Sequence, residues 1–210
     1  MNCEITIIQY NCGNANHRNA RPIFDAVSPI HHTVLAIQEP YFNEKTRTTY
    51  CPTGHTLAYD PNPATKVCFM VSKEVHSDHW SYKTYSPYVA SLRLRTIDNH
   101  LTIINVYNPR SNGPRIQTWE KIAEAIAEVE GEIILLGDFN AHHPAWGGTQ
   151  AANEPQSGHL LIETSRRGLQ LLTPKGELTW KRGMQQSVID LTFATERTRN
   201  TLLHCGPEDK

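Results

Sequence analysis

The residues best suited to catalysis lie in Gly137–Gly148 (GDFNAHHPAWGG), directly after the apolar run Ile133–Leu136. A short aliphatic run that ends at a glycine indicates a buried strand. Asp138 and Asn140 are therefore expected at the carboxyl end of a strand, pointing the same way because side chains alternate along an extended backbone. A carboxylate beside an amide can activate water and hold a phosphoryl group. The common structural alternative is an Asp-x-Asn turn that only caps the strand.

Polar residues also stand at or near the ends of other expected strands, namely Asn11, Glu39, Tyr107 and Asp190. Each has a structural explanation on its own, as a turn former, a solvated charge, a rim aromatic or an edge carboxylate. Taken with the Asp138 pair, they suit one reaction. Glu39 and Asn11 offer the oxygen ligands that Mg²⁺ prefers, with Mn²⁺ as an alternative ion. Asp138 can deprotonate water, and Asn140 and Tyr107 can donate hydrogen bonds to phosphoryl oxygens. The set indicates metal-dependent hydrolysis of a phosphodiester.

The elements that would position these residues follow from the apolar pattern. Strands are predicted at 5–10, 34–37, 67–71, 88–95, 101–107, 133–136, 169–172, 177–180 and 188–193, the first of them as a central strand. Helices are predicted at 20–27, 114–129, 160–167 and 196–203, with an irregular segment at 41–64. Asp98-Asn99 predicts a hairpin turn between the fourth and fifth strands. The order favours an α/β (α+β) fold of two packed sheets with helices outside, and a doubly wound parallel sheet is the alternative.

Length and composition bound the class of protein. The 210 residues, without repeats or linkers, predict a single domain spanning 1–210. No apolar run approaches the length of a membrane span and no signal peptide is recognisable, so neither a membrane partner nor secretion is expected. Five irregularly spaced cysteines favour free thiols in a reducing compartment. The net charge of −1 gives no support for a nucleic-acid partner and does not exclude one. Eleven histidines without CxxC or HExxH spacing predict no zinc site.

Five motifs carry a resemblance to a known family. They are Tyr10-Asn11, Gln38-Glu39-Pro40, Asn105-Val106-Tyr107-Asn108-Pro109, Gly137-Asp138-Phe139-Asn140 and Ser187-Val188-Ile189-Asp190-Leu191-Thr192-Phe193. In this order they resemble the endonuclease/exonuclease/phosphatase superfamily, which includes DNase I-like and apurinic-site nucleases. The HHPAWGG extension is similar to the endonuclease domain of non-LTR (LINE-type) retrotransposons. The resemblance extends over nearly the whole chain.

The resemblance implies a four-layer, DNase I-like sandwich and a role for each motif residue. Glu39 would bind the metal with Asn11 beside it, Asp138 would activate water, and Asp190 would orient a catalytic histidine. Tyr107 and Asn140 would contact the scissile phosphate, and Thr179 would lie on the DNA side. The contacts expected with double-stranded DNA come from His142, His143 and Arg110, while Arg93, Arg95 and Arg115 are weaker candidates. The implied activity is nicking of nuclear target DNA for retrotransposon insertion, with a reverse transcriptase in the parent polypeptide.

The chain departs from the family pattern at its carboxyl end. The family's last motif is Ser-Asp-His, followed by a closing strand, and the sequence stops at Gly206–Lys210, about where that motif would begin. Ser77-Asp78-His79 stands in the wrong order to replace it. We therefore expect a domain without its final strand and a weak or inactive nuclease. The alternatives are a non-catalytic DNA- or protein-binding remnant, or another phosphoesterase of the superfamily. Two roles are possible for Trp146: its ring could stack on a DNA base, or it could hold its own loop in place.

Overall fold

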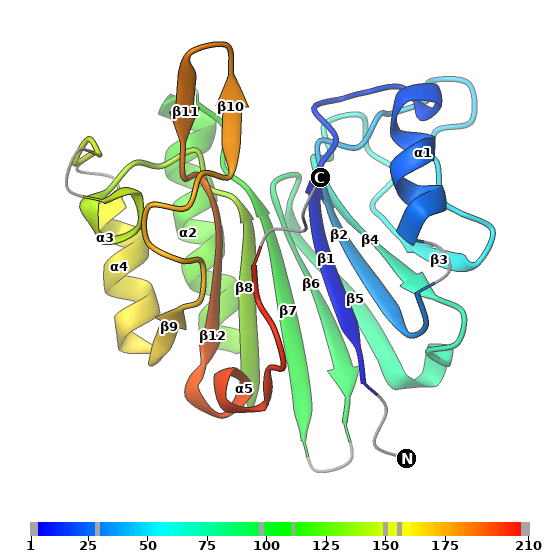
Figure 1. Cartoon of the computed structure of the whole chain (residues 1–210). Helices are drawn as coiled ribbons and strands as arrows, with labels where there is room; N and C mark the ends of the chain where they lie inside the picture. Colours follow the sequence, from blue (N-terminus) through cyan, green and yellow to red (C-terminus); the bar gives the residue numbers. More distant parts are fainter. Residues whose placement is uncertain are drawn as a thin grey trace.

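Two β-sheets pack face to face with helices on their outer faces, which confirms the predicted fold class (Figure 1). The computed structural model describes residues 4–27, 30–96, 99–110, 112–148, 151–154 and 157–206. Three apolar clusters fill the layers. Val34, Phe69 and Leu92 belong to the cluster between the sheets, while the other two lie beneath the helices on either side. Within the described residues, no helix is long and apolar enough to cross a membrane.

The smaller sheet has the order β1-β2-β4-β3. Its strands are β1 (Thr6–Asn11), β2 (Thr33–Gln38), β3 (His55–Ala58) and β4 (Val67–Ser72), and α1 (His17–Val27) covers its outer face. β1 and β2 run parallel, so both end at the same rim. The prediction of a central first strand is wrong for the described sheet: β1 lies at its edge and is half-buried throughout, whereas β2 is fully buried.

The larger sheet has the order β5-β6-β7-β8-β12-β9. Its strands are β5 (Trp80–Ser86), β6 (Val89–Arg95), β7 (His100–Tyr107), β8 (Glu132–Asp138), β9 (Leu169–Leu171) and β12 (Asp190–Thr195). The helices are α2 (Asn112–Glu128), α3 (Pro144–Gly147), α4 (Ser157–Arg166) and α5 (Glu196–Thr201), with a 3₁₀ turn at Ser77–His79. The hairpin of β10 (Trp180–Arg182) and β11 (Gln185–Ser187) projects from one end of the sandwich (Figure 1).

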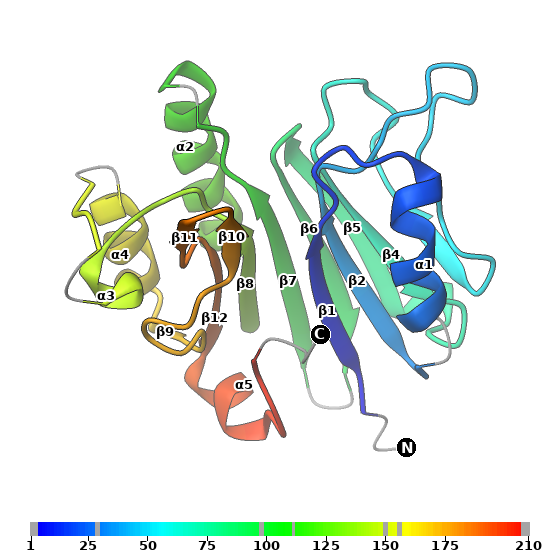
Figure 2. The same cartoon turned by 45° about the horizontal axis from the view of Figure 1, so that its top comes forward.

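Strand register brings the polar strand ends together. β7 and β8 are parallel, and their pairing sets Tyr107 opposite Asp138. β12 runs antiparallel to β8 and begins with Asp190, also opposite Asp138. Since β1 and β2 end at the same rim of the facing sheet, strand ends from both sheets gather at one end of the sandwich (Figure 2). The polar residues of five strands stand at or beside these ends.

Some predicted boundaries differ from the structure. The strand predicted at 177–180 is wrong except for Trp180, because Thr179 lies in a loop that supports β12. β3, β5 and α3 were not predicted; β5 contains exposed polar residues and half-buried aromatic ones but no aliphatic residue, so it lacks the apolar signal. β6 and β7 are antiparallel neighbours as predicted, while Asp98 of the predicted turn lies outside the described residues.

Candidate active site

A close approach of two strands places Asp138 at the rim. Gly137, in β8, has φ +143°, and a Cβ atom there would lie 1.9 Å from the Val106 carbonyl oxygen of β7. Only glycine allows the strands to meet at this point. Asp138 follows immediately and is 5% exposed, so its carboxylate is nearly enclosed by protein.

Asp138 is held by groups from both sheets. Asn11 Nδ2, from β1, donates to Asp138 Oδ2 at 2.8 Å, and the Asn140 amide donates to Asp138 Oδ1 at 2.9 Å. Burial, and then the charge of Asp190, raises the pKa of Asp138 to about 7, although these two hydrogen bonds oppose the rise. A carboxyl group with a pKa near neutrality is suited to accept a proton from water.

Asp190 faces Asp138 from the neighbouring strand. Gln9 Nε2, from β1, donates to Asp190 Oδ1 at 3.1 Å. Thr179 Oγ1 accepts the backbone amides of Ile189 and Asp190 at 3.0 Å each, so this threonine supports the start of β12. Burial raises the pKa of Asp190 to about 6, against the lowering effect of its hydrogen bonds with Thr179 and Gln9. The structure thus gives Thr179 a supporting contact with Asp190.

Glu39 occupies a constrained position at the end of β2. Its φ is +47°, in the left-handed region that non-glycine residues rarely adopt. The Glu39 amide donates to the Lys66 carbonyl at 2.8 Å, its carbonyl accepts from the Asn14 amide at 2.9 Å, and its Oε1 accepts from Asn14 Nδ2 at 3.0 Å. Lys66 Nζ donates in turn to Asn14 Oδ1 at 2.9 Å. Burial, then the charge of Glu39 and a hydrogen bond with it, raises the pKa of Tyr107, which keeps the phenol protonated as a donor.

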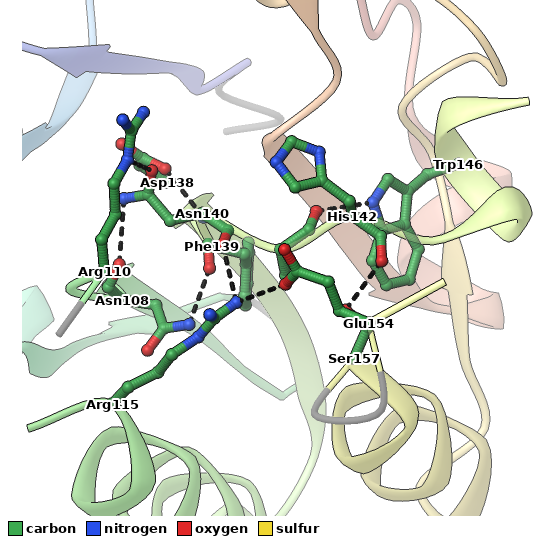
Figure 3. A network of polar contacts seen from close by, with 11 residues as sticks. Asn108, Arg110, Arg115, Asp138, Phe139, Asn140, His142, Trp146, Glu154 and Ser157 are labelled. Carbon is green, nitrogen blue, oxygen red and sulfur yellow. Dashed lines mark hydrogen bonds and ion pairs between the residues drawn. The ribbon is translucent and has the colours of Figure 1, made fainter. Parts of the chain in front are cut away.

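Asn140 is the most completely bonded residue of the site (Figure 3). It is 7% exposed and also has a positive φ, +43°. Its Nδ2 donates to the Asn108 carbonyl at 2.9 Å, its Oδ1 accepts from Arg110 Nε at 2.9 Å, and its carbonyl accepts from Arg115 Nη2 at 2.8 Å. The Arg110 guanidinium lies 5.5 Å from the Trp180 ring centroid, which connects the β10–β11 hairpin to the site.

The loop after Asn140 is pinned by its own side chains. Trp146 is fully buried and donates from Nε1 to the Ala141 carbonyl at 3.0 Å, so it pins the loop and is not available to stack on a base. His143 Nδ1 accepts the Ala145 amide at 3.0 Å and caps α3. The rings of His143 and Trp146 are 5.2 Å apart. The His142 side chain is half-buried near them.

The site residues fit a divalent cation held by few protein ligands. No cluster of three or more His, Cys, Asp or Glu suited to a metal occurs within the described ranges. Three carboxyl groups, those of Glu39, Asp138 and Asp190, lie close enough that the charges of Glu39 and Asp190 raise the pKa of Asp138. Negative charge is therefore concentrated at this site. Asn11 Oδ1 accepts only the Gly13 amide at 2.8 Å among the described contacts, which leaves a lone pair on an amide oxygen. A carboxylate and an amide oxygen, with water and phosphate completing the shell, suit Mg²⁺.

Other candidates from the sequence lie elsewhere. Ser77–His79 precedes Trp80, which pairs with Leu94 at the opposite end of the larger sheet from Tyr107. Tyr107 lies six residue steps along the strand from Leu101, which is opposite Leu94, a distance of about 20 Å. This Ser-Asp-His therefore lies far from the site, as its place in the chain predicts. Arg93 and Arg95 also lie toward that far end of β6 and project to solvent.

Sequence reasoning missed the residues that support the site. They are Gln9, Asn14, Asn108, Arg115 as a buried group, and Glu154. Asn108 donates from Nδ2 to the Phe139 carbonyl at 2.7 Å and is fully buried. Its position directly after Tyr107 was the available signal. The sequence carries no signal that Arg115 and Glu154 support the site, because charged residues at a helix start and in a loop are usually solvated.

Comparison with known proteins supports the architecture. The TRAS1 endonuclease domain, from a telomere-specific non-LTR retrotransposon, matches with a TM-score of 0.69 and 20% identity, over 92% of this chain and 86% of that one. An AP endonuclease from Leishmania major matches with a TM-score of 0.67 and 12% identity, over 91% and 79% of the two chains. The catalytic domain of Xenopus laevis APE2 matches with a TM-score of 0.68 and 13% identity, over 91% and 82%. At these identities, the matches establish the fold.

No curated protein sequence matches the chain. A family model described as endonuclease-reverse transcriptase, however, matches residues 101–209, more than half of the chain. The matched segment contains Tyr107, Asp138, Asn140 and Asp190, four of the residues that converge at the rim. The chain therefore belongs to the endonuclease-reverse transcriptase family, within the DNase I-like endonuclease/exonuclease/phosphatase superfamily.

Proposed function

We propose that the chain is a divalent-metal-dependent endonuclease that nicks double-stranded DNA in the nucleus to allow insertion of a retrotransposon. The observation that carries the proposal is the enclosure of Asp138. This carboxyl group, with a pKa of about 7, has Asn11, Tyr107, Asn140 and Asp190 around it from separate segments of the chain. Such convergence supplies a base, hydrogen-bond donors and negative charge at one point, as phosphodiester hydrolysis requires.

In this proposal Asp138 removes the proton from the attacking water. Its Oδ1 and Oδ2 each accept one hydrogen bond, which fixes the plane of the carboxylate. Tyr107, held protonated, donates to a phosphoryl oxygen. Asn140 donates to another through its side-chain amide, which has the buried Asn108 carbonyl as its partner when no DNA is bound.

Glu39 and Asn11 are the residues we propose to hold the metal. Mg²⁺ supplies charge neutralisation at the phosphate when bound, and Mn²⁺ is the alternative ion. Asn14 fixes the Glu39 carboxylate through Oε1, and the left-handed backbone of Glu39 directs it to the rim. The chain would thus hold the ion by one carboxylate and one amide, leaving the other positions to water and the DNA phosphate.

Arg110 and the β10–β11 hairpin give the site a surface for DNA. Arg110 is exposed and uses Nε for Asn140, which leaves its terminal nitrogens for a phosphate oxygen. Lys181 is exposed on the hairpin beside Trp180. His142, half-buried at the loop, is a further candidate contact, whereas His143 is engaged locally as a cap. In the parent polypeptide, a reverse transcriptase would use the nicked end.

A plasmid-nicking assay tests the proposal. Supercoiled DNA is incubated with the chain and Mg²⁺, with a chelator control and with Asp138→Asn, which keeps the shape of the side chain. We expect slow conversion to the open circle, because Gln9 and not a histidine donates to Asp190 among the described residues, and we expect this conversion to depend on Mg²⁺ and to be lost in Asp138→Asn. Absence of nicking by the unaltered chain, or equal nicking by Asp138→Asn, would contradict the proposal.

A second candidate is a DNA-binding module without catalysis. The observation that favours it is the environment of Asp190: in the part of the chain that the structure describes, Gln9 and not a histidine donates to its carboxylate. Fluorescence anisotropy with labelled duplex DNA separates the two. Binding at moderate salt, without Mg²⁺-dependent nicking, would favour the module.

A further inference from the structure

A buried arginine beside the candidate site contacts the backbone carbonyl of Asn140 and not its side chain. Arg115 lies in the first part of α2, and its residue is 9% exposed. Its Nη2 donates to the Asn140 carbonyl at 2.8 Å and to Glu154 Oε2 at 2.7 Å (Figure 3). A guanidinium that is nearly excluded from water requires partners of this kind, because an unpaired buried charge is strongly unfavourable. Arg115 thus joins a helix, the site loop and a distant carboxylate.

Glu154 is itself held against the same loop. Its amide donates to the His142 carbonyl at 3.2 Å, and its own carbonyl accepts the Ser157 amide at 2.9 Å. Ser157 Oγ also donates to the His142 carbonyl at 3.0 Å. Glu154 is therefore held by His142, which lies two residues after Asn140 in the chain. With its backbone held in this way, the Glu154 carboxylate orients the Arg115 guanidinium.

Asn140 needs such support because its backbone is unfavourable. A left-handed conformation is less favourable than the helical or extended ones even for asparagine, which adopts it more readily than most other non-glycine residues, unless the surroundings impose it. That conformation directs the Asn140 amide to Asp138 while its side chain meets Arg110 and Asn108. The carbonyl would be a buried acceptor without a partner if Arg115 were removed.

We infer that Arg115, oriented by Glu154, is a positioning residue that holds the Asn140 backbone in its left-handed conformation and so fixes the Asn140 side chain at the candidate site. The effect on the backbone stands independently of any reaction, whereas the effect on catalysis rests on the proposed function. Arg115 touches neither the water nor the phosphate in this scheme. It acts only through Asn140.

Amide hydrogen exchange of Asn140, followed by NMR, tests the backbone effect. We compare the unaltered chain with Arg115→Met and with Glu154→Gln, which keeps the side-chain volume and leaves Arg115 in place. Arg115→Lys keeps the positive charge but lacks the planar guanidinium, whose N–H groups can donate to two acceptors in fixed directions. Arg167→Met is the matched control, since Arg167 also donates to a backbone carbonyl, that of Val129, at the other end of α2.

We expect Asn140 to exchange at least about tenfold faster in Arg115→Met, Arg115→Lys and Glu154→Gln, since the amide loses its fixed contact with Asp138. The amide of Leu135, in the core of β8, should keep its protection, and Arg167→Met should leave Asn140 unchanged. Equal protection of Asn140 in the unaltered chain and Glu154→Gln would overturn the inference. So would an equal loss in Arg167→Met, which would show general loosening of the helix. If Arg115→Met does not fold, Glu154→Gln still decides.

Nicking kinetics test the catalytic effect. In Glu154→Gln we expect kcat to fall about tenfold while KM for plasmid DNA changes less than about threefold, because Asn140 is misplaced at the reacting phosphate and DNA contacts elsewhere are intact. A change confined to KM would overturn the catalytic part of the inference. If the unaltered chain does not nick DNA, the proposed function fails, and the exchange measurement alone decides the role of Arg115.

Discussion

At the scale of single residues, the enclosure of Asp138 sets the chemistry and also imposes a cost. Folding raises the pKa of this carboxyl group from 3.8 to about 7, so the folded state prefers the neutral form. The contribution of Asp138 to the free energy of unfolding is therefore greatest below about pH 4 and is lost as the pH rises through about 7. The group that would accept a proton is stabilising when protonated and destabilising when charged, a frequent property of functional sites.

This charge balance leads to a prediction for metal-free protein. The Asp138 carboxyl carbon, followed by ¹³C NMR in a chelator, should titrate near pH 7, because burial and Asp190 disfavour its charge. Glu39→Gln should lower the pKa, since the Glu39 charge raises it. Saturating Mg²⁺ should lower it in the unaltered chain and have little effect in Glu39→Gln. An identical response to Mg²⁺ in both proteins would show that Glu39 does not hold the ion.

At the scale of elements, apolar runs predicted the strands that carry the site, whereas the supporting contacts could not be predicted. β2, β4 and the middle of β8 are fully buried and consist mainly of apolar residues, so composition alone predicts them. β5 has exposed polar residues and half-buried aromatic ones but no aliphatic run, and the short strand β3 lies within the segment at 41–64 that was predicted to be irregular. Asp138 was recognisable from its place after a strand. Gln9, which donates to Asp190, was not recognisable, because that contact spans 181 positions and depends on how the sheets pack.

The approach of β7 and β8 gives a prediction at this scale. Gly137→Ala should reduce the free energy of unfolding by more than about 3 kcal/mol, because the added Cβ would overlap the Val106 carbonyl oxygen and φ is positive. Gly158→Ala is the control: it lies in α4 with open space around it, and should stabilise by about 0.5–1 kcal/mol. Urea unfolding measures both. Equal stability of the two variants would mean that the strands do not meet as described.

At the scale of the whole molecule, buried amides fix the two sheets relative to one another and thereby align the rim. Asn105, in β7, donates from Nδ2 to the Ile37 and Cys68 carbonyls of the facing sheet at 3.0 Å each. Gln38 Nε2 donates back to Asn105 Oδ1 at 2.6 Å. Both residues are fully buried, in an otherwise apolar interface. Such a network specifies one register between sheets that apolar contacts alone would leave loose.

Removing this network should weaken the whole fold. Asn105→Ala should cost about 2–4 kcal/mol of unfolding free energy, because it removes three buried hydrogen bonds, one from Gln38 and two to backbone carbonyls of the facing sheet. Asn153→Ala, at an exposed loop position, should change stability by less than about 0.5 kcal/mol. Thermal and urea denaturation give the comparison. A loss below about 1 kcal/mol for Asn105→Ala would show that packing, and not the amide network, aligns the sheets.

The claim that rim residues from both sheets form one hydrolytic site is tested most directly by a double-mutant cycle on the nicking rate. Plasmid nicking is measured for the unaltered chain, Asp138→Asn, Glu39→Gln and the double variant under saturating Mg²⁺. If the two residues serve one step, each single change should lower the rate by at least about a thousandfold, and the double change should add less than about tenfold more. Independent, multiplying losses, or a single variant that nicks at the original rate, would contradict a shared site.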